Sequence, residues 1–494
     1  MSIPNAAPAA PIAPTGWGTL RLLTRYHWFV FVVAALGWLA DCMDQQLFNL
    51  ARVSAVTELL KKEISDPDRL SAAIKDWASY STSIFLMGWA TGGIAFGILG
   101  DRWGRVKTML LTILLYSVFT GLSALSVHVW DFAFYRFLTG LGVGGEFAVG
   151  VALLAETMPA AARPFTLGLL QAFSAIGNVT AALLFMLTGH LEAQGFFKDL
   201  YLFGLGPITP WRLLFVVGTL PAVIALFVRR RLQEPEAWRR QAEAGVTKKL
   251  GSYAEMLGQS PWRRHALAGL ALAFSGVVGL WAIGFFSVDL QQYVFKDRLV
   301  REHFHIAQGE KLTPKQLDDY LKQAPELAGD IKFYAGVTSL VLQLGAFCGM
   351  FAFSTVTSVT GRKVAFAISL VLAAASTALV FLRLNSVTDI LWMVPLMGFC
   401  QLALFGGYAI YFPELFPTRL RSTGTSFCYN VGRFVAAIGP VLLAKLTTDV
   451  FAGYQSVDPA LPFRYAGLTM CSVFGVGLVA LLFLPETKGK PLPE

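Results

Sequence analysis

A short frame of residues occurs twice in this chain, 258 residues apart. The frame Glu-x-x-Pro-x-x-x-Arg occupies residues 156–163 and again residues 414–421. A Gly-Arg pair precedes each copy, at residues 104–105 and 361–362, and these pairs lie 257 residues apart. Two landmarks with nearly the same offset indicate an internal duplication. We therefore expect two homologous halves, with any binding site between them.

The chain is too apolar for a soluble protein of this length. Its mean hydropathy is +0.57 and only 14% of its residues are charged, whereas a soluble chain carries about a quarter. A membrane-spanning helix needs roughly 20 apolar residues. Twelve such segments are present, six before and six after the basic stretch 229–264: residues 28–50, 77–99, 108–128, 131–155, 166–188, 211–229, 265–288, 333–354, 364–383, 389–412, 422–445 and 464–484. The sequence predicts an all-α membrane protein with twelve transmembrane helices in two six-helix, pseudo-symmetric bundles.

The same pattern predicts the domain organisation. We expect a cytoplasmic N-terminal tail, a first bundle, a cytoplasmic linker, a second bundle and a cytoplasmic C-terminal tail. Their predicted ranges are 1–26, 27–230, 231–263, 264–484 and 485–494. The Pro/Ala-rich N-terminus has no apolar core, so it is interpreted as a tail and not as a cleaved signal.

The net charge of +9 is explained by its position along the chain. The densest basic cluster, from residues 229–231 to 263–264, falls in the segment that joins the two halves. Lys and Arg accumulate on the cytoplasmic side of membrane proteins. We therefore expect a multi-pass protein of the cell (inner) membrane with both termini in the cytoplasm. The predicted partner of the positive charge is the lipid bilayer, with no nucleic acid.

Two long segments between spans have patterns of their own. In 289–332, Thr313 and Gln316 form a capping box around Pro314, and Leu317 begins an apolar helical face. We expect a short amphipathic helix over the outer mouth, which is either a surface decoration or a gate. The central inner segment, which begins L-Q-E-P-E-A-W-R-R, is predicted to form helices that hold the bundles together.

Several motifs resemble those of the major facilitator superfamily. The segment G-I-L-G-D-R-W-G-R-V-K (97–107) resembles its signature loop, and Y-R-F-L-T-G-L-G-V-G-G-E (135–146) resembles its fourth-helix motif. L-Q-E-P-E-A-W and the terminal P-E-T-K-G resemble the branch that contains sugar porters and organic-ion transporters. The Gly-Gly-Glu ending is most similar to subgroups that import organic acids and other metabolites with protons. The resemblance implies that this chain transports a small molecule, as members of this branch do.

The resemblance also implies a cytoplasmic latch between the bundles. Asp101 is expected to accept hydrogen bonds at the N-terminus of a neighbouring helix, and Arg102 and Arg105 to pair with acids at helix ends. The latch residues expected from the signature loop and the repeated frames are Gly97, Asp101, Arg102, Gly104, Arg105, Glu156, Arg163, Gly361, Arg362, Glu414 and Arg421.

Other positions depart from related subgroups. The first helix carries D-C-M-D-Q-Q-L-F-N, which differs from the sugar-porter pattern, and the seventh helix lacks the paired glutamines of sugar porters. The fifth helix lacks the Gly-Pro motif of drug/proton antiporters. These departures make sugar uptake and drug efflux less favoured alternatives.

Charged residues inside the spans are expensive and indicate function. Asp41 and Asp44 share one face of the first helix, at a depth comparable with that of Arg136 on the fourth helix. We expect one or both acids to pair with Arg136 in the empty carrier, so that a proton or an anionic substrate competes for the pair. The alternative is a fixed structural ion pair. Glu146 is a further candidate for proton coupling or for a structural hydrogen bond.

Polar residues complete a candidate substrate cavity. Arg433 is a candidate anion contact from the second half, with ion pairing or snorkelling as its alternative. The neutral candidates are Gln45, Asn49, Gln171, Asn178, Gln343, Gln401 and Asn430, each of which could instead join helices by hydrogen bonds. Trp281, Phe285, Tyr408 and Tyr411 are candidates for an aromatic subsite, or for ordinary packing.

The sequence has no strand-associated phosphate loop, and no G-x-x-x-x-G-K-[ST] motif, so transport must draw on an ion or solute gradient. No nucleophile–base set or metal-ligand cluster is visible, so an enzyme is not expected, nor a cofactor. We expect a secondary transporter that takes up a small organic acid, a monocarboxylate or aromatic carboxylate, with protons by alternating access. A sugar or polyol carrier is the alternative, and a drug exporter or a non-transporting sensor ranks below it. The expected partners are a small-molecule substrate and protons, with a functional monomer.

Overall fold

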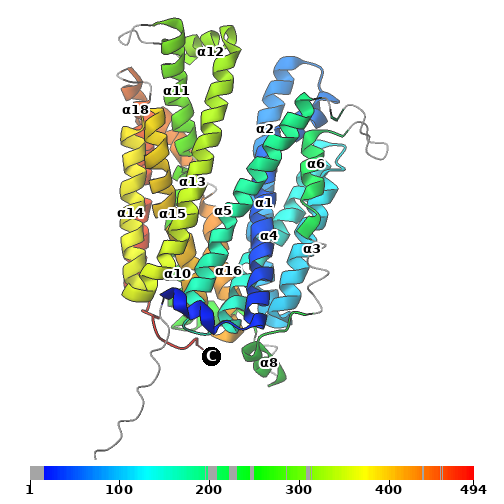
Figure 1. Ribbon diagram of the computed structural model, residues 1–494, viewed down its shortest axis with the longest axis vertical. Helices are drawn as coiled ribbons and strands as arrows, with labels where there is room; N and C mark the ends of the chain where they lie inside the picture. Colours follow the sequence, from blue (N-terminus) through cyan, green and yellow to red (C-terminus); the bar gives the residue numbers. More distant parts are fainter. Residues whose placement is uncertain are drawn as a thin grey trace, which may run out of the picture.

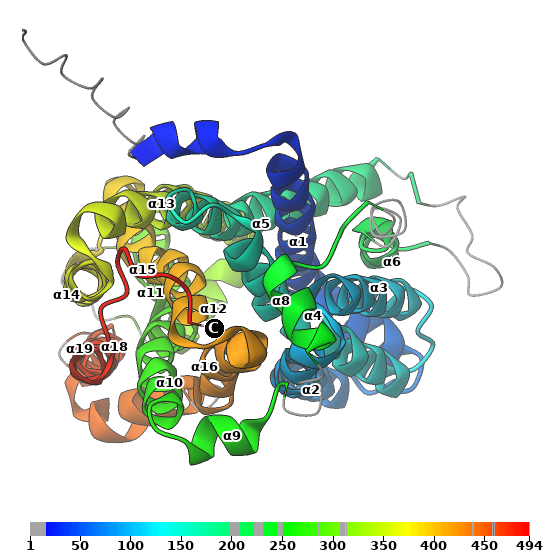
Figure 2. The ribbon, with the colours of Figure 1, turned by 90° about the horizontal axis from the view of Figure 1, so that it is seen from below.

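The computed structural model describes residues 16–493, except residues 195, 198–207, 222–230, 245–249, 285, 307–311, 313, 437–438, 457 and 459. The described residues are almost entirely helical, and no strand occurs among them. Figure 1 shows long helices that run side by side in two groups, and Figure 2 shows the two groups from one end.

The first bundle comprises the helices that precede the linker. Its members are α1 (Arg25–Lys61), α2 (Pro67–Trp103), α3 (Arg105–Ser123), α4 (Val129–Thr157), α5 (Arg163–Ala193) and α6 (Pro210–Val217), with the short η1 (Gly16–Leu22) before them. The linker contains α8 (Glu236–Glu243) and α9 (Tyr253–Gly258).

The second bundle comprises the helices that follow the linker. Its members are α10 (Trp262–Val278), η3 (Gly279–Gly284), α11 (Phe286–Phe304), α12 (Pro314–Gln323), α13 (Pro325–Thr360), α14 (Arg362–Arg383), α15 (Val387–Leu415), η4 (Thr418–Leu420), α16 (Arg421–Ala436), α17 (Gly439–Lys445), η5 (Leu446–Val450), η6 (Ala452–Ser456), α18 (Leu461–Met470) and α19 (Val473–Phe483). We call the end of both bundles that carries Arg105 and Arg362 the motif end, and the opposite end the far end. The helices of the two bundles diverge toward the far end (Figure 1).

Among the described residues, nine helical stretches are long and apolar enough to cross a membrane. The described residues cover the other three predicted spans only in part. Residues 222–229 of the sixth, residue 285 of the seventh and residues 437–438 of the eleventh lie outside them, and the described part of the seventh passes from α10 into the π-helix η3. The arrangement fits the predicted twelve helices in two bundles.

The internal duplication is visible in how the helices pack. A Cβ on Gly92 of α2 would overlap the carbonyl of Leu141 on α4, and a Cβ on Gly349 of α13 would overlap the carbonyl of Phe399 on α15. Small residues let membrane helices approach this closely. The two contacts are related by offsets of 257 and 258 residues, so the repeat of the motifs is also a repeat of the closest helix pairs.

A second repeated feature was not predicted from the sequence. Arg212 at the start of α6 donates to the carbonyl of Ala124 at 2.5 Å, beyond the C-terminus of α3. Arg464 in α18 donates to the carbonyl of Phe381 at 2.8 Å, near the C-terminus of α14. Both arginines are buried, and a cation stabilises the carbonyl end of a helix. The two arginines lie 252 residues apart. A comparison of the two halves at an offset of 257–258 residues therefore does not align them.

The segment between the first two predicted spans, residues 51–76, is mostly helical in the structure. Helix α1 continues to Lys61 and α2 begins at Pro67, so only residues 62–66 lie between these two helices. Polar residues on the extension have partners: Arg52 donates to Thr82 at 3.0 Å, and Glu58 pairs with Arg212 at 3.0 Å. These contacts allow the helix to extend beyond its apolar part.

The predicted amphipathic helix at the far end is present as α12, although Thr313, its predicted cap, lies outside the described residues. Leu317 is buried in a small apolar cluster with Val300 of α11 and Leu327 of α13. The helix therefore packs on the extensions of α11 and α13 (Figure 1).

Candidate substrate and proton site

Three charged side chains of the first bundle are buried together. Asp41, Asp44 and Arg136 are at most 1% exposed. Asp44 Oδ2 lies 3.7 Å from Arg136 Nη1, and Thr120 Oγ1 donates to Asp44 Oδ1 at 2.6 Å. Asp44 therefore has both an ionic and a hydrogen-bonding partner, whereas Oδ1 of Asp41 has no hydrogen-bond partner among the described residues.

The described contacts of Arg136 all belong to the first bundle. Its Nε and Nη2 donate to Ser123 Oγ at 3.0 and 2.7 Å. Its guanidinium lies over the rings of Phe48 and Phe215, 5.6 and 4.7 Å from their centroids. The guanidinium is buried inside one bundle, and its Nη1 has no hydrogen-bond partner among the described residues. The expected competition between a proton and a substrate anion for Arg136 stays a prediction.

The Asp44–Arg136 pair is testable by a double-mutant cycle. Removal of one partner leaves the other charge buried and unpaired, which costs about 3–5 kcal/mol. Arg136→Met and Asp44→Asn should each lower the thermal unfolding midpoint of the purified protein. The double variant should unfold at a higher temperature than additivity of the two losses allows. Strictly additive losses would contradict the pair.

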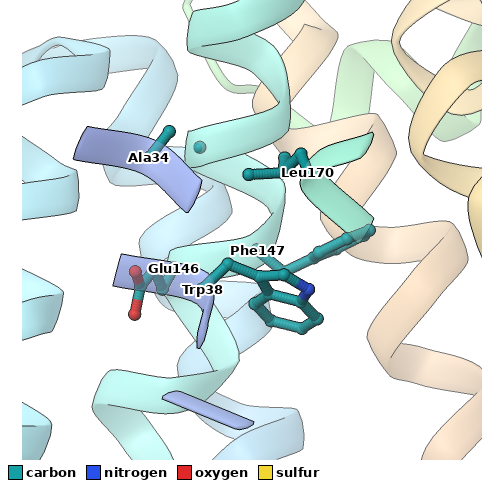
Figure 3. A pocket seen from close by; sticks show the side chains of 6 residues that line it. Ala34, Trp38, Glu146, Phe147 and Leu170 are labelled. Carbon is teal, nitrogen blue, oxygen red and sulfur yellow. The ribbon is translucent and has the colours of Figure 1, made fainter. Parts of the chain in front are cut away.

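Glu146 of α4 lies on the motif-end side of these residues. It is 3% exposed, and its Oε2 has no hydrogen-bond partner within the described structure. It lines a small pocket with Ala34, Trp38, Phe147, Gly150 and Leu170. Figure 3 shows the Glu146 carboxylate beside Trp38 of α1 at this pocket. No group of three potential metal ligands occurs among the described His, Cys, Asp and Glu residues.

Arg433 of α16 lies between the bundles. Its guanidinium carbon is 3.8 Å from the ring centroid of Trp89 on α2 and 4.4 Å from that of Tyr429 on α16. Nη1 donates to Asn430 Oδ1 at 3.1 Å, and Nε has no hydrogen-bond partner among the described residues. Asp41 acts on Arg433 electrostatically. In the described part of the chain Arg433 forms no ion pair.

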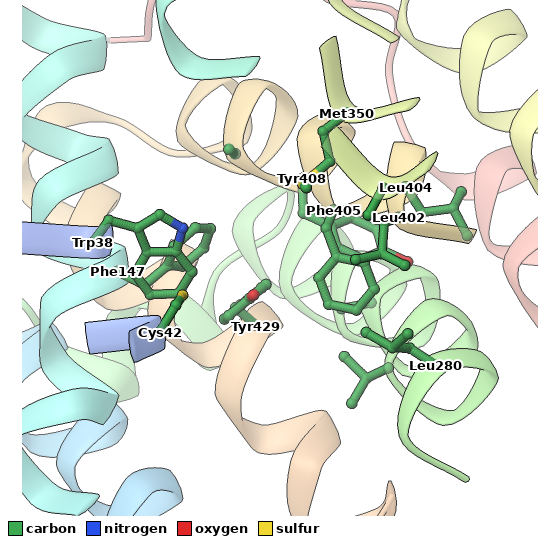
Figure 4. Packing of buried hydrophobic residues seen from close by; sticks show 14 of the residues in the cluster. Trp38, Cys42, Phe147, Leu280, Met350, Leu402, Leu404, Phe405, Tyr408 and Tyr429 are labelled. Atoms are coloured by element: carbon green, nitrogen blue, oxygen red, sulfur yellow. The ribbon is translucent and has the colours of Figure 1, made fainter. Parts of the chain in front are cut away.

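Aromatic side chains continue this contact across the interface. The rings of Phe147 on α4 and Tyr429 are stacked with centroids 4.0 Å apart. Figure 4 shows Trp38, Cys42 and Phe147 of the first bundle facing Tyr429, with Phe405 and Tyr408 beyond it. The surface around Arg433 is therefore aromatic on both sides.

The neutral polar candidates fall into two groups. Tyr408 donates to the carbonyl of Leu272 at 2.9 Å, Gln401 donates to Thr377 at 2.6 Å, and Asn430 donates to the carbonyl of Gly144 at 3.2 Å. These bonds join helices, which is the alternative that the sequence left open. The side chains of the second group are buried or partly buried, and they form no hydrogen bond that joins helices among the described residues: Gln45, Asn49, Gln171, Asn178 and Gln343.

The aromatic candidates are mostly packed. Tyr408 and Tyr411 are completely buried in the second bundle, and the hydroxyl of Tyr411 donates to the carbonyl of Pro485. Phe285 and the side chain of Trp281 lie outside the described residues.

Asp101 joins the two bundles at the motif end. Its carboxylate accepts the backbone N–H groups of Ser422 and Thr423 at 3.1 and 2.8 Å, and the Thr423 hydroxyl at 2.6 Å. These residues form the N-terminus of α16, where an anion is favoured. An acid of the first bundle thus caps a helix of the second.

Glu156 forms the second connection between the bundles. Its Oε1 pairs with Arg105 Nη2 at 2.9 Å and with Arg421 Nη1 at 2.6 Å. Arg105 also donates to the carbonyl of Thr418 in the second bundle at 2.6 Å. All three charged side chains are at most 1% exposed, so the contact is a buried network.

The second copy of the frame has different partners. Arg362 pairs with Glu414 at 2.9 Å, as Arg105 pairs with Glu156. Arg163, however, forms no ion pair with Glu414 in the described structure, and its Nε has no hydrogen-bond partner there. The Glu414 carboxylate instead accepts Thr487 Oγ1 at 2.6 Å. Glu156 of the first copy therefore pairs with Arg421 of the second, whereas Glu414 of the second copy does not pair with Arg163 of the first in the described structure.

The remaining latch residues shape the backbone. Gly104 and Gly361 have φ angles of +119° and +98°, a region that favours glycine. A Cβ on Gly97 would lie 2.7 Å from Ser426 Cβ of α16, so this glycine permits the close contact between bundles. Arg102 was expected to pair with an acid, but its Nε donates to the carbonyl of Leu250 in the linker at 2.9 Å.

Two glutamates at the motif end were not among the candidates. Glu234 accepts the backbone N–H groups of Arg105 and Val106, at 2.7 and 3.1 Å, and so caps α3. Glu486 accepts the N–H of Arg362 at 2.9 Å and caps α14. The signal that could have located them is the likeness of L-Q-E-P at 232–235 and L-P-E-T at 484–487, 252 residues apart.

Glu486 lies outside the membrane-spanning helices. Burial raises the pKa of its carboxyl group, but the backbone N–H groups of Arg362, Lys363, Thr487 and Lys488 outweigh this effect and hold the pKa below its usual value. The ionised cap is therefore maintained at neutral pH.

Comparisons with known proteins agree with this geometry. A family model described as "Sugar (and other) transporter" matches residues 29–249. A putative metabolite transport protein of Haemophilus influenzae is 27% identical over 95% of this chain and 99% of its own length. The fold matches the solved proton:xylose symporter XylE with a TM-score of 0.60 at 18% identity, over 94% of this chain and 98% of that one. The resemblance to the major facilitator superfamily is confirmed.

Two further relatives carry more specific descriptions. A probable 4-methylmuconolactone transporter of Cupriavidus pinatubonensis is 27% identical over 92% of this chain and 89% of its own length. A cis,cis-muconate transport protein of Acinetobacter baylyi is 26% identical over 93% of this chain and 95% of its own length. The chain has the twelve-helix, two-bundle major facilitator fold, and its relatives indicate a multi-pass membrane transporter and not an enzyme.

Proposed function

We propose that this chain is a secondary transporter that takes up a small organic acid together with protons by alternating access. The observation that carries the proposal is the placement of Arg433. Its guanidinium lies between the bundles, flanked by aromatic rings and without an ion pair in the described structure. A buried unpaired charge is costly, and a substrate carboxylate would supply the missing partner through a bidentate contact.

The relatives support this substrate class. Muconate and 4-methylmuconolactone, which appear in the descriptions of two relatives, are organic acids with conjugated or unsaturated carbon skeletons. A flat apolar body suits the aromatic side chains of Trp89, Phe147 and Tyr429 around Arg433. We therefore favour an aromatic or unsaturated carboxylate as the substrate.

The buried acids supply the proposed proton coupling. Asp41, Asp44 and Glu146 lie in the first bundle. In the second half of the chain, a shift of 258 residues places Leu404 at the position of Glu146 and Val394 at that of Arg136. Protonation lowers the cost of holding carboxylates in a membrane. The first bundle is thus the proposed proton-handling half, and Arg433 is the substrate contact of the second.

The proposed topology places the motif end in the cytoplasm of a bacterial-type inner membrane, with both termini there. The excess of Lys and Arg around the linker supports this orientation. In this orientation the structure is closed on the cytoplasmic side by Asp101 and Glu156, while the bundles diverge toward the outside (Figure 1). We propose that the two bundles rock about the substrate site, and that a monomer is sufficient.

Uptake into proteoliposomes tests the proposal. Purified protein is reconstituted, an inward proton gradient is imposed, and uptake of radiolabelled benzoate, cis,cis-muconate and glucose is measured. Because benzoic acid crosses lipid unaided, protein-free liposomes provide the baseline. Accumulation of a carboxylate above this baseline, abolished by a protonophore, is the expected result. Gradient-driven glucose accumulation with no carboxylate uptake would contradict the proposal in favour of a sugar carrier.

A further inference from the structure

We propose that Asp41 and Glu146 share one transferable proton, that this proton leaves from Glu146 toward the pocket on its motif-end side, and that Gly37 is the positioning residue that makes room for the Glu146 carboxylate. The inference rests on the proposed proton coupling. The sequence alone does not show which of Asp41, Asp44 and Glu146 carries the proton.

The pocket lies on the motif-end side of Glu146, which indicates the direction of proton release. Helix α1 runs from the motif end to the far end, so Ala34 and Trp38, which line the pocket, precede Asp41 on the motif-end side. At 1.5 Å per residue, Ala34 lies about 15 Å closer to the motif end than Asp44. Gly150 and Leu170 approach the pocket from the motif-end halves of α4 and α5. Among Asp41, Asp44 and Glu146, Glu146 lines this pocket (Figure 3).

The Glu146 carboxylate occupies space that only a glycine leaves open. A Cβ on Gly37 would overlap Glu146 Oε1 and would lie 3.3 Å from Ile113 Cδ1. The carbonyl of Gly37 accepts the Tyr116 hydroxyl at 3.5 Å, which holds α1 against α3 at this level. The carboxylate is therefore set into a notch in α1, one turn before Asp41.

The titratable and charged groups near Glu146 and Asp41 come from three elements. Asp41 on α1 carries the like charge that interacts with it, and Cys42 on the same helix is also within electrostatic range. Tyr116 faces it from α3. Arg433 of α16 acts on Asp41 from the second bundle. Two buried carboxylates in one site repel each other unless one is protonated, so a single shared proton is the favoured content of the site.

Asp44 is the least suited of the three acids. It already has the Thr120 hydroxyl at 2.6 Å and the Arg136 guanidinium at 3.7 Å. These partners stabilise a fixed carboxylate. Each of the three acids has one oxygen without a hydrogen-bond partner among the described residues: Oδ1 of Asp41, Oδ2 of Asp44 and Oε2 of Glu146. The Thr120 hydroxyl and the Arg136 guanidinium therefore distinguish Asp44 from the other two.

The proposed transfer moves one proton from Asp41 to Glu146 and then to water. Asp41 takes up a proton from the far side, the proton passes to Glu146, and the Glu146 O–H bond then breaks to release the proton to water on the motif side. Glu146 is left as a carboxylate that repels an ionised Asp41 and so favours reloading. A substrate anion bound at Arg433 neutralises the guanidinium charge and so weakens its attraction for ionised Asp41. Substrate binding thereby favours protonation of Asp41.

Proteoliposome assays of three variants test the assignment. Glu146→Gln should lose proton-driven carboxylate accumulation but keep substrate exchange, which needs no net proton movement. Gly37→Ala should reduce the rate of accumulation by up to ~100-fold, since displacement of a reacting group by about 1 Å has effects of that order. Adding Glu146→Asp, which shortens the side chain, should restore part of the accumulation of Gly37→Ala. Gly189→Ala, where a Cβ meets nothing within 4 Å, is the control.

The outcomes separate this inference from the proposed function. If the unaltered protein shows no proton-driven accumulation, the proposed function fails. If the unaltered protein accumulates carboxylate and Glu146→Gln does so equally well, the assignment of Glu146 is overturned while the proposed function stands. Equal loss of exchange and accumulation in Gly37→Ala, with no recovery on adding Glu146→Asp, would overturn the positioning role of Gly37.

Discussion

Arg433→Ala is expected to abolish carboxylate binding while leaving a folded protein in the membrane. Arg433 contacts the substrate in the proposed site, and loss of one partner of a buried, hydrogen-bonded charge pair costs about 2–5 kcal/mol. Every 1.4 kcal/mol is tenfold in affinity, so the dissociation constant should rise by ~30-fold to several thousand-fold. The measurement is the carboxylate-induced shift of the thermal unfolding midpoint, because a ligand that binds the folded state raises it.

Two further variants make the Arg433 result specific. Arg433→Lys keeps the charge but loses the bidentate geometry, so it should bind between the unaltered protein and Arg433→Ala. Arg419→Ala removes another arginine of the second bundle, which pairs with Glu255 at the motif end, and should leave carboxylate binding unchanged. An unaltered carboxylate-induced shift in Arg433→Ala would show that the substrate anion is bound elsewhere, with Arg136 as the first place to look.

Glu156→Gln is expected to open the motif end. The change replaces the carboxylate between Arg105 and Arg421 with a neutral amide, so the two buried guanidinium groups lose the carboxylate that joins them. Asp101, 3.0 Å from Arg105 Nη1, remains as a counter-charge to Arg105. Loss of about 3 kcal/mol or more from the closed state would move its balance with an open state by ~100-fold or more. Spin labels at Lys107 in the first bundle and Thr360 in the second, both exposed at this end, should report longer and broader distances.

A matched substitution controls for simple loss of charge. Glu236 pairs with Arg240 at the same end of the molecule, but both side chains are more than 70% exposed, and such pairs contribute little. Glu236→Gln should leave the spin-label distances unchanged. If Glu156→Gln also leaves them unchanged, the buried network is not the latch.

The fold could be predicted because its causes are local or periodic. Long apolar stretches define the spans, and the repeated frame relates the two halves. Along a helix, the depth of Asp44 and of Arg136 can be counted from the ends of their segments. The motif resemblance also identified the signature loop of Asp101 and Arg105, because its residues are adjacent in the chain.

The candidate site could be predicted only in part, because a helical sequence does not state which neighbour each side chain faces. Arg136 and Arg433 both appear as buried cations in the sequence. In the structure, Arg136 is surrounded by the first bundle, while Arg433 lies between the bundles. Glu234 lies 129 residues after the helix start that it caps, and the notch at Gly37 depends on how α1 meets α4. These features arise from tertiary packing, which no local pattern encodes.

The most direct test of the account is proton influx driven by the substrate itself. Proteoliposomes containing a pH-sensitive dye are prepared at the same pH inside and outside, and an outward potassium gradient with valinomycin sets a negative interior. Addition of an accumulated carboxylate to the outside should acidify the interior faster than in protein-free liposomes, and Glu146→Gln should remove this difference. Carboxylate accumulation by the protein without any acidification above the protein-free baseline would contradict proton-coupled transport.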